Sequence, residues 1–185
     1  HLIMRKKILY ITITALSLFI LFVFYQIMNP ASPLETVYYE SDVKNISVTY
    51  SRPLKKGRLV FGNESDGALV PFDIYWRTGA NRHTIIETDS DLKIMDNVLR
   101  PGKYSLFTTP GKEYWDVTFN SSNSYFGIMR PESEKDEFTI TVPSNSLETV
   151  TEQFTIDFIT SNSDSISNVG IRLKWDLTEI IIPLK

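Results

Sequence analysis

The longest uninterrupted hydrophobic segment of the chain lies near its N-terminus. Residues Ile8 to Met28 form a run of 21 residues without a charge, dominated by Ile, Leu and Phe. As an α-helix this run would be about 31 Å long, which matches the hydrocarbon core of a bilayer. It is apolar on every face and longer than most helices of globular proteins. A transmembrane helix is therefore favoured over a buried core helix.

The charges beside this helix predict its orientation. Arg5, Lys6 and Lys7 lie directly before it, whereas Asn, Pro, Ala, Ser and Pro follow it. Positive charge favours the cytoplasmic side, so we expect residues 1–7 to be a cytoplasmic N-terminus and residues 8–28 a single-pass signal anchor. The rest of the chain is then extracytoplasmic. The rival interpretation is a cleavable signal peptide, whose apolar region is normally shorter and ends in small residues.

Beyond the membrane segment the hydrophobic pattern changes to a two-residue period. Apolar and polar residues alternate in Ile46 to Tyr50, Trp115 to Phe119 and Phe138 to Val142. Such alternation predicts half-buried β-strands. Further strands are expected at 58–61, 74–78, 83–88, 92–95, 103–108, 154–158, 169–175 and 180–184. Residues 148–152 fit either one helical turn or a loop.

These strands predict an all-β fold. About nine or ten short strands separated by polar loops favour an antiparallel β-sandwich of two packed sheets, preceded by the single transmembrane helix. Pro30 and Pro33 break the helix, because proline lacks the N–H that a helix requires. We therefore interpret residues 29–42 as a tether and residues 43–185 as one extracytoplasmic domain.

Composition excludes several classes of protein. The formal net charge is −3, and no basic stripe remains beyond the three residues before the helix. Nucleic acid is therefore not an expected partner. The chain has no cysteine, which excludes disulfides, thiolate metal sites and a cysteine nucleophile. No histidine pair or calcium loop has the spacing of a metal site, so we expect neither a metal nor another cofactor.

Several short blocks resemble the signature of one protein family. They are Tyr50-Ser51-Arg52-Pro53, Lys56-Gly57-Arg58 with Phe61-Gly62, Val70-Pro71, Trp76 to Asn81, Pro101 to Pro110 and the strand Trp115 to Asn120. Their order matches that of the family called domain of unknown function 2911, and they cover nearly all of the outer domain. The resemblance implies a β-rich domain of the bacterial cell envelope without an established activity. It also implies that the anchor lies in the bacterial inner (cytoplasmic) membrane. Arg82-His83 departs from the family pattern, where a small or acidic pair is more frequent.

The densest group of candidate ligand-binding residues is Trp76 to Asn81. It combines a large aromatic ring, a permanent cation, a glycine and an amide within six residues. Arg77, together with Arg52 and Arg58, would suit a carboxylate, phosphate or sulfate, because a guanidinium binds such anions in a fork. We therefore expect these three arginines, Asn81 and Trp76 to contact a ligand. The alternative is structural: Arg77 pairs with a carboxylate, and Trp76 belongs to the core.

The residues around this stretch lead to two further expectations. A three-residue loop centred on Arg82 would place Arg77 and Glu87 opposite one another on the two strands of a hairpin. His83 is the only histidine besides His1, and we expect it at the surface. Catalysis by a serine or threonine that a histidine activates is therefore not favoured.

We favour a membrane-anchored extracytoplasmic module that binds a small molecule, a glycan or a protein in the cell envelope. One alternative is an envelope hydrolase or lyase that uses carboxylates such as Glu87 or Asp116, because the fold sets the spacing of a catalytic pair. The other is a purely structural interaction module. A shallow groove with cationic and aromatic side chains would favour binding, whereas two inward carboxylates in a cleft would favour an enzyme.

Overall fold

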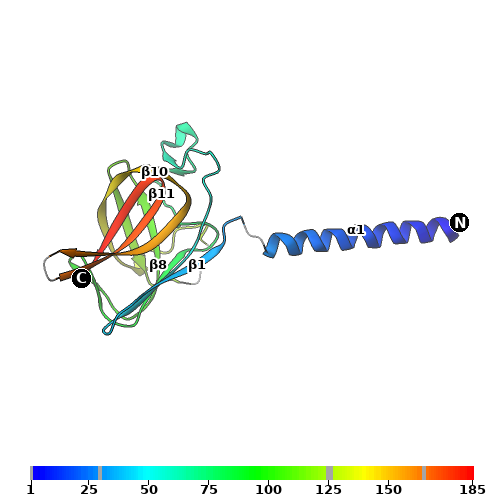
Figure 1. Cartoon of the computed structure of the whole chain (residues 1–185). Coiled ribbons are helices and arrows are strands. Elements are labelled where there is room, and N and C mark those ends of the chain that lie inside the picture. The colour runs from blue at the N-terminus through cyan, green and yellow to red at the C-terminus, as the bar shows by residue number, and fades with distance from the viewer. Residues whose placement is uncertain (1, 29–30, 124–126, 164–165) are drawn as a thin grey trace. The chain divides into compact units, whose positions relative to one another are not determined.

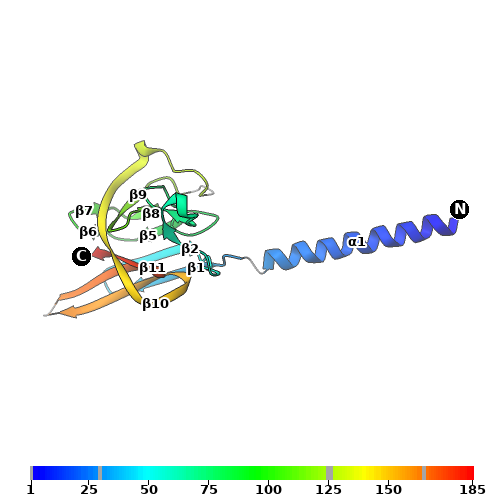
Figure 2. The ribbon, with the colours of Figure 1, turned by 90° about the horizontal axis from the view of Figure 1, so that it is seen from above.

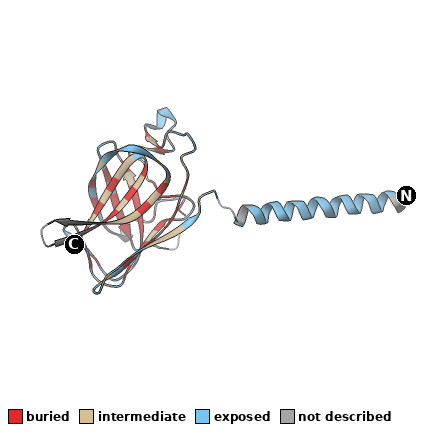
Figure 3. Ribbon diagram, in the orientation of Figure 1, coloured by how far each residue is buried: buried red, intermediate tan, exposed pale blue. Residues whose placement is uncertain are grey.

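The computed structural model describes residues 2–28, 31–123, 127–163 and 166–185, in two compact units, residues 1–33 and 34–185. The first unit contains helix α1 (Leu2–Met28), in which Met4–Tyr25 is long and apolar enough to cross a membrane. The apolar side chains along α1 are exposed (Figure 3), as expected of a helix that lipid would surround. One N-terminal apolar helix with the length of a membrane span is therefore present, as predicted.

The second unit is built almost entirely of strands. Among the described residues, nine strands form one sheet in the order β1-β2-β5-β8-β9-β10-β11-β6-β7, and all the neighbouring pairs are antiparallel. The strands are β1 (Leu34–Glu40), β2 (Asn45–Ser51), β5 (Thr84–Thr88), β6 (Leu92–Ile94), β7 (Asn97–Leu99), β8 (Gly102–Pro110), β9 (Tyr114–Asn120), β10 (Asp136–Ser163) and β11 (Ile166–Leu184). A small parallel pair, β3 (Phe61–Gly62) and β4 (Val70–Pro71), and two short 3-10 helices, Glu64–Asp66 and Ser133–Lys135, complete the unit. The prediction of an all-β, antiparallel domain is confirmed.

The long strand β10 joins the two parts of this sheet, β1-β2-β5-β8-β9 and β11-β6-β7. Its first part, residues 136–143, pairs with β9, and residues 144–163 pair with β11. The register of the second ladder shifts between Ser146 and Thr155, and such irregularities bend a strand. Figure 2 shows this bend where β10 turns from yellow to orange. The two sheets expected of a sandwich are therefore two regions of one continuous ladder, and residues 148–152 belong to a strand.

The sheet curls around a single hydrophobic core (Figure 1). The backbone beyond β2 reaches β10, where Phe154 N–H donates to Pro53 O at 2.9 Å and Lys55 N–H donates to Glu152 O at 2.7 Å. Alternate residues of the strands point inward and are buried, for example Val48, Ile86, Leu106, Val117, Ile140, Ile156, Leu173 and Ile182. This arrangement explains the two-residue hydrophobic period of the sequence.

The structure differs from the tether expected at residues 29–42. Residues 34–40 form β1, which pairs with β2 along its whole length, from Leu34 opposite Ser51 to Glu40 opposite Asn45. This strand lacks simple alternation because an inward position carries a charge. Glu35 accepts hydrogen bonds from Tyr50 and Arg52, which allows a carboxylate to lie at that position.

The strand expected at 74–78 is replaced by one isolated bridge between Trp76 and Thr108. Asp73 and Thr78 on either side have φ angles of 61° and 59°. Left-handed residues interrupt the extended backbone that a ladder needs. The segment therefore makes a short contact with β8 and then turns away.

Candidate functional site

Trp76 is part of the core. Its side chain is 8% exposed and packs parallel to Trp175, with ring centroids 6.0 Å apart, while Nε1–H donates to Gly79 O at 3.1 Å. Trp115 and Phe154 also pack against its ring. The packing therefore supports the structural alternative, in which Trp76 belongs to the core and does not contact a ligand.

The Arg77–Glu87 pair expected from the sequence is wrong. Arg77 Nη1 donates to Asn81 O at 3.3 Å, within the turn itself. Glu87 instead forms an ion pair with Lys103 Nζ at 3.2 Å, directly across from it on β8. The reason is topological: β5 pairs with β2 and β8, so residues 74–78 do not form a hairpin with it.

The other two predicted arginines bind their own chain. Arg52 forms an ion pair with Glu35 at 3.2 Å and also donates to Phe154 O on β10. Arg58 donates to Lys55 O and Leu54 O within one turn. No hydrogen bond or ion pair found among the described residues links Arg52 or Arg58 to Arg77. Of the predicted ligand contacts, only Arg77 and Asn81 are thus joined to each other in the structure.

His83 is 3% exposed, so the expectation of a surface histidine is wrong. The Ser105 hydroxyl on β8 donates to Ser122 O, which leaves its oxygen to accept from His83 Nδ1–H, 3.1 Å away. On the other side of the ring, His83 Nε2 lies 2.9 Å from the Tyr75 hydroxyl, which also lies 3.3 Å from the Met129 carbonyl oxygen. The Ser105 contact favours the Nδ1–H tautomer of the neutral imidazole.

The surroundings of His83 favour its neutral form. Burial lowers the pKa of His83 below its usual value, the Met129 carbonyl opposes this lowering, and the positive charge of Arg77 adds to it. Burial also raises the pKa of Tyr75 to about 12, although Arg77 and Arg130 act in the opposite direction. The cluster therefore acts as a neutral hydrogen-bonded anchor at neutral pH.

A loop beyond β9 covers this cluster. Gly127 N–H donates to Asn81 O at 2.9 Å, and a Cβ at Gly127 would lie 2.6 Å from a ring carbon of His83 and 3.0 Å from Arg77 Cβ. Only glycine leaves room for this approach. The next two side chains, Ile128 and Met129, are 66% and 77% exposed.

Arg130 is fixed at the end of this segment. Its guanidinium lies 5.0 Å from the centre of the Phe107 ring and forms an ion pair with Asp136 at 2.5 Å. Residues 127–130 are thus held in place by backbone, aromatic and ionic contacts, while the side chains at 128 and 129 project outward.

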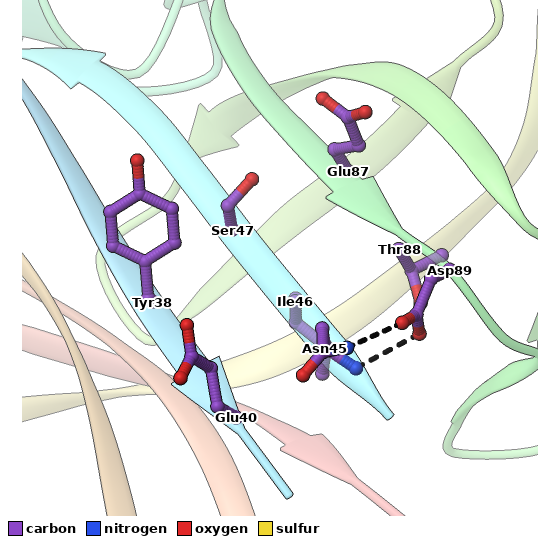
Figure 4. Close-up of a pocket in the computed structure, with 8 residues that line it drawn as sticks. All are labelled: Tyr38, Glu40, Asn45, Ile46, Ser47, Glu87, Thr88 and Asp89. Carbon is purple, nitrogen blue, oxygen red and sulfur yellow. Dashed lines mark hydrogen bonds between the residues drawn. The ribbon is translucent and has the colours of Figure 1, made fainter. Parts of the chain in front are cut away.

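The second region of interest is a groove of about 410 Å³ on the outer face of β1, β2 and β5 (Figure 4). Tyr38, Ser47 and Glu87 lie opposite one another on the three strands. Glu40 and Asn45 form the next row, and Asp89 follows β5. The full lining is Tyr38, Glu40, Asn45, Ile46, Ser47, Glu87, Thr88 and Asp89. Three of these eight side chains are carboxylates.

Asn45 orients one of these carboxylates. Its backbone N–H and side-chain amide donate to the two oxygens of Asp89 at 2.9 and 2.6 Å (Figure 4). These bonds lower the pKa of Asp89, so its negative charge is retained throughout the neutral range. Among the described residues, no group of three or more His, Asp or Glu side chains has the arrangement of a metal site.

Sequence reasoning missed most of this groove. Tyr38 and Glu40 fall in the stretch interpreted as a tether, and Asn45 and Ser47 are ordinary residues of a strand. Glu87 was considered as a candidate catalytic carboxylate. The available signal was the pattern of β1, in which Thr36, Tyr38 and Glu40 share one face.

Comparison with known proteins gives one match. A family model described as "Protein of unknown function (DUF2911)" matches residues 32–184, which is most of the chain. No curated protein and no solved structure matches it.

Proposed function

Because the chain belongs to the DUF2911 family, whose function is unknown, we propose its role from its own geometry. The protein is a membrane-anchored, extracytoplasmic binding module of the bacterial envelope, and its groove on β1, β2 and β5 binds a positively charged ligand. The supporting observation is the groove itself, in which three carboxylates and an exposed tyrosine ring surround a space of about 410 Å³.

The charge of the groove favours a cation. Lys103 neutralises Glu87 through an exposed ion pair, whereas no ion pair within 4 Å is found for Glu40 or Asp89 in the described part of the chain. The groove therefore retains negative charge that a ligand can balance. Tyr38 is 66% exposed, and the face of such a ring attracts an ammonium or guanidinium group. A lysine or arginine side chain of an envelope protein, or an amine-bearing glycan, has the required chemistry.

The proposed membrane anchor supports an extracytoplasmic location for residues 34–185. The three basic residues near the start of α1, Arg5, Lys6 and Lys7, favour a cytoplasmic N-terminus, and they are three of the 19 basic residues of the chain. Residues 34–185 therefore carry 16 basic against 22 acidic side chains. An acidic outer domain attracts cationic ligands over a distance of about 10 Å at moderate ionic strength.

The hydrolase alternative has no comparable support. Glu87 lies in the groove and is bound to Lys103, whereas Asp116 lies on β9 and accepts a hydrogen bond from Thr141 at 2.6 Å. Strand β8 separates β5 from β9 in the sheet. The two candidate carboxylates thus belong to different parts of the outer surface.

Titration of the detergent-solubilised full chain with trilysine, followed by calorimetry, tests the proposal. We expect binding that weakens as salt rises, because the contact is ionic. Tyr38→Ala should weaken it about two- to five-fold, the effect of an exposed cation–π contact. Glu40→Gln should weaken it by a similar factor. Lys103→Gln should strengthen it, because Glu87 then loses its competing partner.

Glu113→Gln provides the matched control, since this exposed residue lies outside the groove. It removes the same charge from the chain and should leave binding of the peptide unchanged. If Glu40→Gln and Glu113→Gln weaken peptide binding equally, the effect comes from the net charge of the protein, and the groove is rejected as the binding site.

A further inference from the structure

The outer domain carries a second surface of different character, centred on residues 127–130. Its members come from two segments that touch through Gly127 and Asn81 and through Tyr75 and Met129. We name it the basic–apolar patch, and it consists of Ile74, Arg77, Arg82, Ile128, Met129 and Arg130. Ile74 is 40% exposed, and Ile128 and Met129 are much more so. We propose that this patch docks on the anionic surface of the membrane in which α1 is anchored.

The chemistry of the patch fits a lipid surface. Two neighbouring apolar side chains at a loop tip can enter the interfacial region of a bilayer, and arginines beside them bind lipid phosphates. Of the three arginines, only Arg130 forms an ion pair found within the described residues. Arg77 and Arg82 thus remain available to an external anion. This local positive charge contrasts with the net acidic composition of residues 34–185.

The position of the patch also fits. Leu34 is the first residue of β1 and lies opposite Ser51. Gly79 approaches Ser51 so closely that a Cβ on it would lie 2.9 Å from the Ser51 carbonyl oxygen. The turn at 77–82 therefore lies at the end of the domain where the chain from the membrane helix enters. Five residues separate α1 from β1, which limits their separation to about 20 Å.

The groove lies at the other end of the same strands. Glu40 and Asn45 close the hairpin of β1 and β2, and a seven-residue strand places them about 20 Å from Leu34. Docking through the patch would therefore hold the acidic groove away from the acidic lipid surface and open to partners. This inference rests on the proposed membrane anchor but not on the proposed cationic ligand.

The interior of the patch is built to keep the tip in place. The His83 cluster contacts Met129 through Tyr75, whose hydroxyl donates to the Met129 carbonyl at 3.3 Å. Arg130 is held by Asp136 and Phe107. These contacts fix the backbone, and the fixed backbone holds the side chains of Ile128 and Met129 at the surface. A rigid apolar tip loses little conformational entropy when it enters a membrane.

The absence of cysteine makes the test direct. Met129→Cys gives a single thiol for an environment-sensitive fluorophore, and Val43→Cys gives the control, because Val43 is 77% exposed in the turn between β1 and β2. Each labelled full-length chain is reconstituted into phosphatidylcholine vesicles, with or without phosphatidylglycerol. Quenching by lipids with a nitroxide on the acyl chain then reports which label reaches the bilayer.

We expect strong quenching at position 129 in vesicles that contain phosphatidylglycerol, and little at position 43. Arg77→Gln with Arg82→Gln should reduce the docked fraction, with an equilibrium about five-fold weaker for each arginine removed. Added salt should act in the same direction without any substitution. A circular dichroism spectrum that matches the unmodified chain verifies that each variant is folded.

Equally weak quenching at positions 129 and 43 in both kinds of vesicle would overturn the proposal and would assign the patch to a protein partner. Equal quenching with and without phosphatidylglycerol would overturn the role of the arginines. Carbonate extraction of the same vesicles tests the anchor separately. Release of the chain would reject the anchor, and docking with it, whereas a retained chain with an unquenched label would reject docking alone.

Discussion

His83 Nδ1 lies 3.1 Å from Ser105 Oγ, so an imidazole from the segment before β5 is held against the outer face of β8. On its other side the same ring lies 2.9 Å from the Tyr75 hydroxyl and 3.3 Å from the Met129 carbonyl oxygen. Protonation of this one side chain therefore affects a contact between three segments that are distant in the sequence.

Acidification should destabilise the domain through His83. Its folded-state pKa is lowered, mainly by burial, so below the unfolded-state value of about 6.5 the unfolded chain binds the proton more readily. The free energy of unfolding should be level above that pH and should decrease as the pH falls below it. Urea unfolding at several pH values measures the slope. His83→Gln should flatten the slope between about pH 5 and 7, and an unchanged slope would contradict the assignment.

Tyr50→Phe should destabilise the closure between β2 and β10. The Tyr50 hydroxyl donates to Glu35 at 2.5 Å and accepts from the Ile156 N–H at 2.9 Å. Its removal leaves a buried N–H without that partner, at a cost of about 1 to 3 kcal/mol. Chemical denaturation gives the value. Tyr38→Phe is the control, because the exposed Tyr38 hydroxyl should contribute less than about 0.5 kcal/mol.

Gly79→Ala should cost more than Gly67→Ala. Both glycines have positive φ angles, 143° and 71°, but only Gly79 faces an atom within 3 Å, the Ser51 carbonyl oxygen. We expect a loss of about 1 kcal/mol at Gly67 from backbone conformation alone. At Gly79 strain and steric overlap together should cost about 2 kcal/mol or more. Thermal unfolding of the two variants side by side provides the comparison, and equal losses would refute the close contact.

Trp76→Ala should reduce the free energy of unfolding by about 3 to 5 kcal/mol, the usual cost of truncating a large buried aromatic residue. The aromatic rings around Trp76 cannot all collapse into the vacated space, so a cavity remains. Tyr114→Ala is the matched control, since Tyr114 is 59% exposed and its loss should cost less than about 1 kcal/mol. A small effect at Trp76 would show that the ring is dispensable for packing.

The alternation of apolar and polar residues predicts strands well where one face of the sheet is buried and the other is exposed to solvent. It identified β2, β9 and both halves of β10, because these strands place every second residue in the core. It missed β1, where Glu35 points inward and is stabilised by Arg52 and Tyr50. A charged residue at an inward position can be recognised as part of a strand only when its hydrogen-bond partners are known.

The sites were harder to predict because they depend on contacts between distant residues. His83 is buried by Gly127, which lies 44 residues further along the chain, and no local pattern indicates that contact. The groove likewise combines Tyr38, Asn45 and Glu87 from three strands whose order in the sheet follows from the whole topology. Of the five candidate ligand contacts, Arg77 and Asn81 lie together because they belong to one turn.

The bent strand β10 has a consequence for the way in which this protein matures. Strands β1, β2, β5, β8 and β9 are synthesised first, yet their sheet closes against residues 152–156 of β10, and β11 adds Trp175, Ile180 and Ile182 to the core. The growing chain therefore exposes an incomplete apolar surface until β11 has been synthesised. Contacts over such long sequence separations also fold slowly. During this interval chaperones would have most of the domain to protect.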